Sequence, residues 1–155
     1  SCLAEVRRQV RIPIMLDESV CSLRDAELAI RHGWCDLFNI RLSKCGGFIP
    51  SLRLVQLARQ HGLGCQLGCQ VGETAILSAA GRHFATSVGG LRYLEGSYDR
   101  YLVREWLSRE DITIGWGGRA PALAGCGLGV TIEPQRLAVV AVRREMLIGC
   151  GRKSE

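Results

Sequence analysis

Six polar side chains follow short apolar runs at regular intervals, and their types suit acid–base and metal chemistry. They are Asp17, Arg41, Lys44, Gln70, Glu73 and Glu95. Asp17, Arg41, Gln70 and Glu95 are separated by 24, 29 and 25 residues, which is the length of one strand–helix unit. An aspartate can take part in acid–base chemistry or bind a hard cation through its oxygen atoms. An arginine stays protonated and can bind an anion. The pattern indicates a site built from the ends of successive strands.

Four apolar runs are expected to form the strands that carry these residues. The runs cover residues 10–16, 35–41, 64–70 and 91–95. Nearly continuous apolar runs are typical of strands buried on both faces. Helices are expected between them, over residues 22–32, 50–61 and 75–84. Ser22 and Asp25 resemble a capping box at the start of the first helix. Alternating strands and helices imply a parallel sheet with right-handed crossovers.

Two α/β architectures accommodate this order of elements. A doubly wound sheet requires a glycine-rich phosphate loop after its first strand, but Asp17, Glu18 and Ser19 occupy that position. A complete (βα)₈ barrel takes about 250 residues, and the 155 residues here hold four units and a tail. We therefore expect half of a TIM-type barrel over residues 1–110, followed by a closing segment and tail over residues 111–155.

Composition agrees with an ordinary globular domain, since 47% of the residues are apolar and 23% are charged. No run approaches 18 consecutive apolar residues, so no membrane span is expected. The first residues contain no apolar core of a secretion signal, which favours a cytoplasmic location. The chain does not begin with Met, so it is expected to be a piece of a longer protein.

The eight cysteines and the arginine excess do not indicate a disulfide framework, a zinc site or a nucleic-acid partner. Cysteines without a secretion signal are expected to be reduced core residues. Cys65 and Cys69 lie near His61, but on a strand they are about 13 Å apart, too far for one zinc ion. The arginines are scattered over expected helix surfaces without interleaved aromatic residues, so the net charge of +5 predicts solvated helix faces.

In the motifs at its strand ends, the sequence resembles the enolase superfamily, in particular its muconate-lactonizing and dipeptide-epimerase branch. Residues 12–20 (Ile-Pro-Ile-Met-Leu-Asp-Glu-Ser-Val) resemble the fifth barrel strand of that branch. Residues 36–47 are similar to its sixth strand, which ends in Lys-x-x-Lys-x-Gly-Gly. Residues 68–74 and 93–96 are similar to the seventh and eighth strands, and residues 125–130 to the segment that closes the barrel. The resemblance implies that the chain is the C-terminal half of the family's barrel and contributes strands five to eight.

The resemblance implies a reaction and a cofactor. The family abstracts the proton α to a carboxylate and forms an enediolate that magnesium stabilises, as in isomerases, epimerases and cycloisomerases, with dehydration left open. Asp17 would be the third carboxylate ligand of Mg²⁺. Arg41 and Lys44 would be the catalytic residues, and Gln70, Glu73 and Glu95 would contact a small carboxylate-bearing substrate.

Two departures from the family pattern leave alternatives open. Arg41 replaces the leading lysine of the sixth strand, and a guanidinium is a poor base. The capping domain, the second-strand lysines and the other metal carboxylates are not among these residues, so this chain alone is expected to be incomplete. A catalytically silent half-barrel that pairs with itself or with a missing half is the alternative. Lys44 also fits a surface loop, Glu73 a helix start, and Glu95 a solvated loop.

Overall fold

The computed structural model describes residues 2–96 and 99–145, and its centre is a four-stranded parallel sheet. The strands are β1 (Met15–Leu16), β2 (Leu37–Ile40), β3 (Gly64–Leu67) and β4 (Tyr93–Leu94), in the spatial order β1-β2-β3-β4. All three neighbouring pairs are parallel. The predicted sheet and strand order are confirmed, although each strand is shorter than its apolar run, and residues 10–14 lie outside β1.

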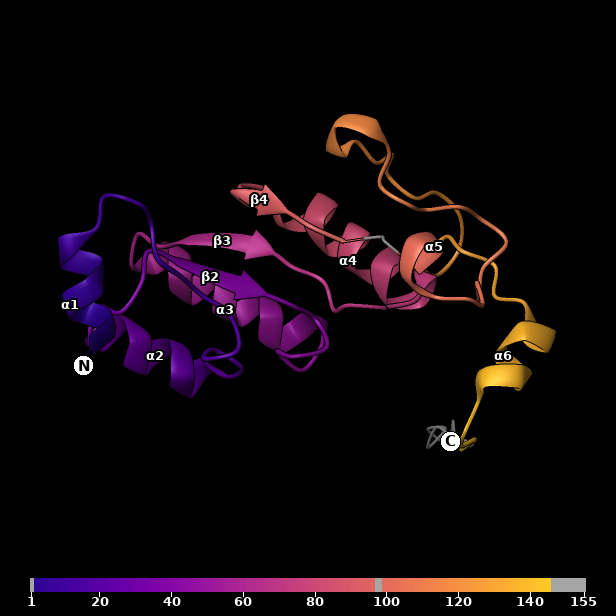
Figure 1. The fold of residues 1–155 in the computed structure, drawn as a ribbon, viewed down its shortest axis with the longest axis horizontal. Helices are drawn as coiled ribbons and strands as arrows, with labels where there is room; N and C mark the ends of the chain where they lie inside the picture. Colours follow the sequence, from indigo (N-terminus) through magenta and orange to yellow (C-terminus); the bar gives the residue numbers. More distant parts are fainter. Residues whose placement is uncertain (1, 97–98, 146–155) are drawn as a thin grey trace, which may run out of the picture.

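Three helices connect the strands as predicted. They are α2 (Leu23–Arg31), α3 (Phe48–Gln60) and α4 (Ala75–Val88). Figure 1 shows α2 and α3 running along one face of β2 and β3. The Ser22 hydroxyl accepts a hydrogen bond from the Asp25 amide and caps α2, as the capping pattern predicted. The third connecting helix continues four residues beyond its predicted end at Phe84.

The core lies between the sheet and these helices. Leu16, Phe38, Ile40 and Leu67 point toward the helices and pack against buried residues of α2, α3 and α4, among them Leu54 and Phe84. Side chains alternate between the two faces of a strand, so Leu37 and Asn39 point away from the helices. Both are nonetheless buried, at 2% and 3% exposure. Met15 and Tyr93 share that second face and are exposed.

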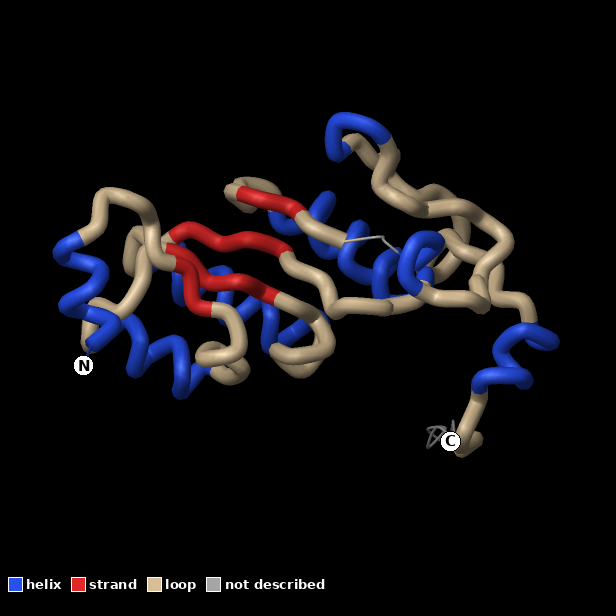
Figure 2. The backbone as a smooth tube through the Cα atoms, viewed as in Figure 1, coloured by secondary structure: helices blue, strands red, loops and turns tan. Residues whose placement is uncertain are grey.

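Sequence reasoning missed four short elements outside the repeating units. They are α1 (Cys2–Gln9), α5 (Asp99–Leu102), a 3₁₀ turn (Trp116–Gly118) and α6 (Pro134–Val140). None of the residues in α1 is buried, so its sequence has no apolar pattern from which the helix could be predicted. Figure 2 shows how much of the chain after β4 is loop, and α6 lies well away from the sheet.

The chain after β4 is held to α4 by two basic side chains. Arg82 donates to the carbonyls of Ile112 and Pro121, and a ring nitrogen of His83 lies 3.0 Å from the carbonyl of Leu128. Leu128 also packs against both apolar clusters of the core. The segment that was expected to close the fold is therefore in contact with it. The tail predicted over residues 111–155 is described only to residue 145, and the proposed boundary at residue 110 stays a prediction.

Candidate active site at the carboxyl ends of the strands

Three of the predicted site residues meet at the carboxyl ends of β1, β2 and β3. Asp17 directly follows β1, and Arg41 directly follows β2 on the same face of the sheet. Arg41 Nη2 donates to Asp17 Oδ2, and Nη1 lies 3.4 Å from Gln70 Oε1. The Arg41 side chain is 18% exposed, so this ion pair is largely shielded from water. The three positions therefore lie in contact with one another.

Glu18 also joins this group. Its Oε1 lies 3.3 Å from Arg41 Nη1, while its side chain remains mostly exposed. Strand β1 ends at Leu16, so the alternation that governs a strand does not apply to Asp17 and Glu18. Arg41 thus contacts two carboxylates and one amide.

Lys44 is buried rather than placed on a surface loop. Its Nζ donates to the carbonyls of Asp17, Val20 and Asn39 at 2.6, 2.8 and 2.9 Å. The same atom lies 3.4 Å from Asp17 Oδ1, and the side chain is 7% exposed. Burial lowers the pKa of the Lys44 ammonium below its ordinary value. All three N–H groups are occupied by backbone, so Lys44 ties the loop after β1 to β2.

Glu73 and Glu95 lie farther along the same end of the sheet and have different surroundings. Glu73 accepts from the backbone amide of Gln70 at 3.0 Å and from the Ser78 hydroxyl at 2.9 Å. It therefore braces the start of α4, where a carboxylate is also favoured by the helix dipole. Glu95 is exposed and accepts from the Cys69 amide at 3.3 Å. Burial, reinforced by the charges of Glu95 and Glu73, raises the pKa of the Cys69 thiol to about 11.

Three of the buried polar atoms without a hydrogen-bond partner belong to β2 or to the residues that follow β1 and β2. Within residues 2–96 and 99–145 they are Asp17 Oδ1, Asn39 Oδ1 and Arg41 Nε, while Trp34, Ser51 and Thr113 each hold one elsewhere. Buried polar atoms normally find partners, so the ends of β1 and β2 are suited to a polar ligand. Asn39 was missed as a site residue. Its position, two residues before Arg41 on the same face of β2, was the available signal.

The residues present fit one part of a magnesium site. Asp17 Oδ1 accepts no hydrogen bond, although Lys44 Nζ lies 3.4 Å away, and a carboxylate oxygen is the ligand type that Mg²⁺ prefers. No group of three or more His, Cys, Asp or Glu side chains in the described ranges is arranged to hold a metal ion. Arg41 and Lys44 also supply positive charge to Asp17. Asp17 is therefore suited to contribute a single ligand to a site completed by other groups.

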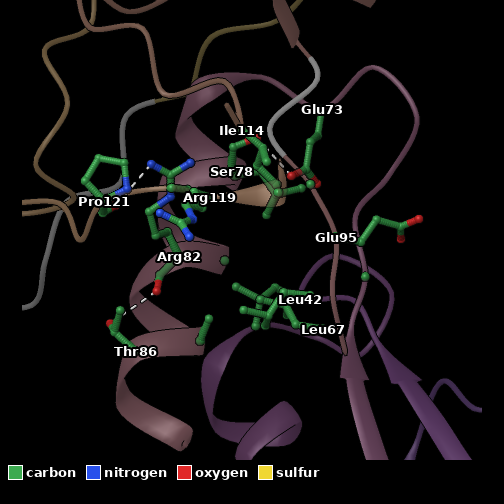
Figure 3. Close-up of a pocket in the computed structure, with 18 residues that line it drawn as sticks. Leu42, Leu67, Glu73, Ser78, Arg82, Thr86, Glu95, Ile114, Arg119 and Pro121 are labelled. Carbon is green, nitrogen blue, oxygen red and sulfur yellow. Dashed lines mark hydrogen bonds between the residues drawn. The ribbon is translucent and has the colours of Figure 1, made fainter. Parts of the chain in front are cut away.

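A cavity of about 670 Å³ lies beside the Asp17–Arg41 group rather than around it. Its walls come from α4, the ends of β3 and β4, and residues 114–121. Figure 3 shows Arg82 and Arg119 on one side of this cavity and Leu42 and Leu67 on another. Glu73 and Glu95 border it, whereas Asp17 and Arg41 do not. The six predicted residues thus divide between the charged group and the cavity rim.

Comparison with known protein families gives a match over most of the chain. Residues 1–136 match the family described as enolase C-terminal domain-like. The chain belongs to this family. The resemblance inferred from the strand-end motifs is thereby confirmed. No helix of the described part of this family member is long and apolar enough to cross a membrane.

Curated relatives are racemases, epimerases and cycloisomerases. Muconate cycloisomerase 1 of Rhodococcus opacus is 35% identical over 131 residues, which are 84% of this chain and 35% of that protein. The N-succinyl-L-Arg/Lys racemase of Bacillus cereus is 38% identical over 85 residues, or 55% of this chain and 23% of the racemase. The chain therefore spans about a quarter to a third of the length of these relatives.

Solved structures extend the likeness to the fold. The dipeptide epimerase from Cytophaga hutchinsonii, complexed with Mg and the dipeptide D-Ala-L-Val, is 29% identical with a TM-score of 0.79, covering 89% of this chain and 37% of the epimerase. The 2-chloromuconate cycloisomerase from Rhodococcus opacus is 26% identical with a TM-score of 0.79, covering 88% of this chain and 37% of that enzyme.

Proposed function

We propose that this chain supplies strands five to eight of an enolase-superfamily barrel and, with them, one side of a magnesium-dependent active site. The observation that carries the proposal is the meeting of Asp17, Arg41 and Gln70 from three successive strand ends, with Asp17 Oδ1 accepting no hydrogen bond. Catalytic residues of barrel enzymes lie at this end of the strands. The dipeptide epimerase of similar fold, solved in complex with Mg, supports the assignment.

The reaction class is abstraction of the proton α to a carboxylate, in an isomerase, epimerase or cycloisomerase, with dehydration as a further outcome. The substrate is a small carboxylate-bearing molecule, as the named substrates of the relatives are. When bound at Asp17, magnesium would supply positive charge that stabilises negative charge on the substrate carboxylate.

Arg41 is assigned to hold the substrate rather than to take its proton. Its guanidinium stays protonated, and one arm is anchored on Asp17 while the other lies within 3.4 Å of Gln70. Anchoring fixes the planar donor group before a carboxylate arrives, which lowers the entropy cost of binding. Lys44 holds the loop that carries Asp17, and Gln70 orients the second arm. Glu73 and Glu95 are placed to contact the far end of a substrate.

A second candidate is a catalytically silent half-barrel that serves as an association module. It is favoured by the absence, among the described residues, of three His, Cys, Asp or Glu side chains arranged for a metal ion, and by exposed Met15 and Tyr93 on the face opposite the helices. The partner would be a second copy of the chain or a missing barrel half, because the free edges at β1 and β4 invite pairing. Analytical ultracentrifugation at micromolar concentration is expected to show dimers or larger species. A rigid monomer with a sharp thermal transition would contradict the half-barrel architecture, and with it both the catalytic proposal and the silent module.

Two measurements test the catalytic proposal. Calorimetry on these 155 residues should detect only weak magnesium binding, since one carboxylate does not make a dedicated site. A micromolar site lost in Asp17→Asn would overturn this. In the protein encoded with its upstream sequence, exchange of the substrate α-proton for deuterium should be lost in Asp17→Asn and retained in Asp111→Asn, an exposed aspartate elsewhere.

Arg41 has its own test in the same exchange assay. Arg41→Lys should keep substrate affinity within about tenfold, whereas Arg41→Ala should lose more because no cation remains. The upstream sequence should also encode a Lys-x-Lys and two further carboxylates at barrel spacing. Exchange that is unaffected by both Asp17→Asn and Arg41→Ala would favour the silent module.

A further inference from the structure

A second pocket, of about 320 Å³, lies at the opposite end of the sheet and gathers four arginines. We call it the basal arginine pocket, after Arg7, Arg8, Arg11 and Arg92. The residues that line it include one carboxylate, Asp36, so its formal charge is +3. Figure 1 shows α1, which carries two of these arginines, beside the end of the sheet at which β2 and β3 begin. Arg7 and Arg8 lie on the surface of α1, as expected of the arginines, and they also line this pocket.

The carboxylate of Asp36 already accepts three hydrogen bonds within the protein. Arg7 Nε and Nη2 donate to Asp36 Oδ1 at 2.9 and 2.7 Å, and the backbone amide of Ile14 donates to Oδ2 at 2.8 Å. Arg7 Nη1 also lies 3.3 Å from the carbonyl of Gly33. Arg7 is therefore a fixed wall of the pocket, and Asp36 has little capacity to neutralise the remaining arginines.

Arg11 and Arg92 are the cations of the pocket that have no direct ion-pair partner among the described residues, although the charge of Arg92 also acts on Asp36. In the part of the chain that the structure describes, neither has a carboxylate within ion-pair distance, whereas Arg8 pairs with Glu5. Arg92 reaches the pocket across Gly64, where an added Cβ would lie 3.4 Å from Arg92 Cδ. The glycine thus leaves room for a long basic side chain to turn toward α1.

We propose that the basal arginine pocket binds a compact phosphate anion, such as the diphosphate group of a small molecule. Guanidinium groups bind phosphate oxygens through paired, charge-assisted hydrogen bonds. The guanidiniums of Arg11 and Arg92 have no ion-pair partner among the described residues, and the guanidinium of Arg7 is fixed beside them by Asp36. This arrangement matches an anion that carries two to three charges on closely spaced oxygens. The pocket is independent of the Asp17–Arg41 group, which lies at the other end of the strands.

The test is calorimetric titration of the chain with inorganic pyrophosphate in low-salt, magnesium-free buffer. The wild-type chain is expected to bind one equivalent. Arg11→Gln combined with Arg92→Gln should weaken binding about tenfold or more, as expected for the loss of charge-assisted hydrogen bonds. Arg53→Gln combined with Arg104→Gln removes the same charge from exposed positions outside the pocket and should leave the affinity within about twofold.

Three results would overturn the proposal. The first is no binding of pyrophosphate to the wild-type chain, and the second is equal weakening in both double variants, which would mean that net charge alone attracts the anion. The third is equal binding of malonate with the same dependence on Arg11 and Arg92, which would mean a general anion surface. Because magnesium is absent, none of these results bears on the proposed catalytic role.

Discussion

Replacing Gly68 by alanine tests the packing of the face that carries the candidate site. A Cβ at this position would lie 2.2 Å from Asn39 Oδ1, 2.7 Å from Nδ2 and 2.8 Å from Cγ. The Asn39 side chain is buried in β2, so it has little room to move away. The backbone of Gly68 is not in the left-handed region, which means that the effect of Gly68→Ala is steric.

The magnitude follows from two opposing contributions. Overpacking a well-packed region costs about 1–3 kcal/mol. Replacing glycine by alanine reduces the entropy of the unfolded chain and returns about 0.4–1 kcal/mol. Because a contact of 2.2 Å is severe, the cost lies at the upper end of its range, and we expect Gly68→Ala to lower the free energy of unfolding by about 2 kcal/mol. Urea unfolding followed by tryptophan fluorescence, at one fixed protein concentration, measures this difference.

Gly81→Ala is the matched control. Gly81 lies inside α4, where an added Cβ would meet Leu67 Cδ2 at an ordinary 3.8 Å. Because glycine weakens a helix interior, this variant should be more stable than wild type by about 0.5–1 kcal/mol. Replacing Asn39 by alanine removes the side chain that the new Cβ would meet. The double variant Asn39→Ala/Gly68→Ala should therefore lose less stability than the sum of the losses in the two single variants. Wild-type stability of Gly68→Ala, or simple additivity of the two changes, would refute the packing argument.

Three further outcomes are expected. Lys44→Met should lower the free energy of unfolding by about 2–4 kcal/mol, since three carbonyls lose a charged donor; an unchanged urea midpoint would contradict this. The hydrogen bond from Arg7 lowers the pKa of Asp36, so wild type should exceed Asp36→Asn in stability by about 1 kcal/mol at neutral pH. That advantage should disappear as the pH falls through the folded-state pKa, as acid titration of unfolding would show. Burial raises the pKa of Cys65 to about 11, so the folded chain keeps a proton that the unfolded chain releases. Stability should therefore fall from about pH 8.5 upward more steeply in wild type than in Cys65→Ala.

The parallel sheet and the meeting of its strand ends were predictable because both depend on local pattern. Apolar runs ending in Asp17, Arg41 and Gln70 repeat at the length of a strand–helix unit, and parallel strands bring their ends to one edge. The strand bounds were less predictable. Residues 10–14 are apolar enough for a strand, but the ladder between β1 and β2 contains only two residue pairs.

The surroundings of Lys44 and the basal arginine pocket were beyond sequence reasoning for a different reason. Lys44 is held by backbone carbonyls, and any residue type supplies a carbonyl, so no residue pattern marks its partners. The pocket needs Arg92 to approach Arg7 and Arg11, which are about eighty residues earlier in the chain. Contacts of that separation depend on how the whole sheet is arranged.

The immediate succession of core and polar residues at the strand ends restricts how the chain tolerates insertions and deletions. Ile40 is fully buried on the helix side, and Arg41 directly follows it on the opposite face. A shift of one residue exchanges the two faces of a strand, so deleting one residue from β2 would carry the guanidinium into the apolar core and the isoleucine toward Asp17. Substitutions at position 41 leave the core intact, whereas a change in the length of β2 damages folding and the charged group together. Natural variation in this stretch should therefore consist of replacements, with length changes confined to the turns between units.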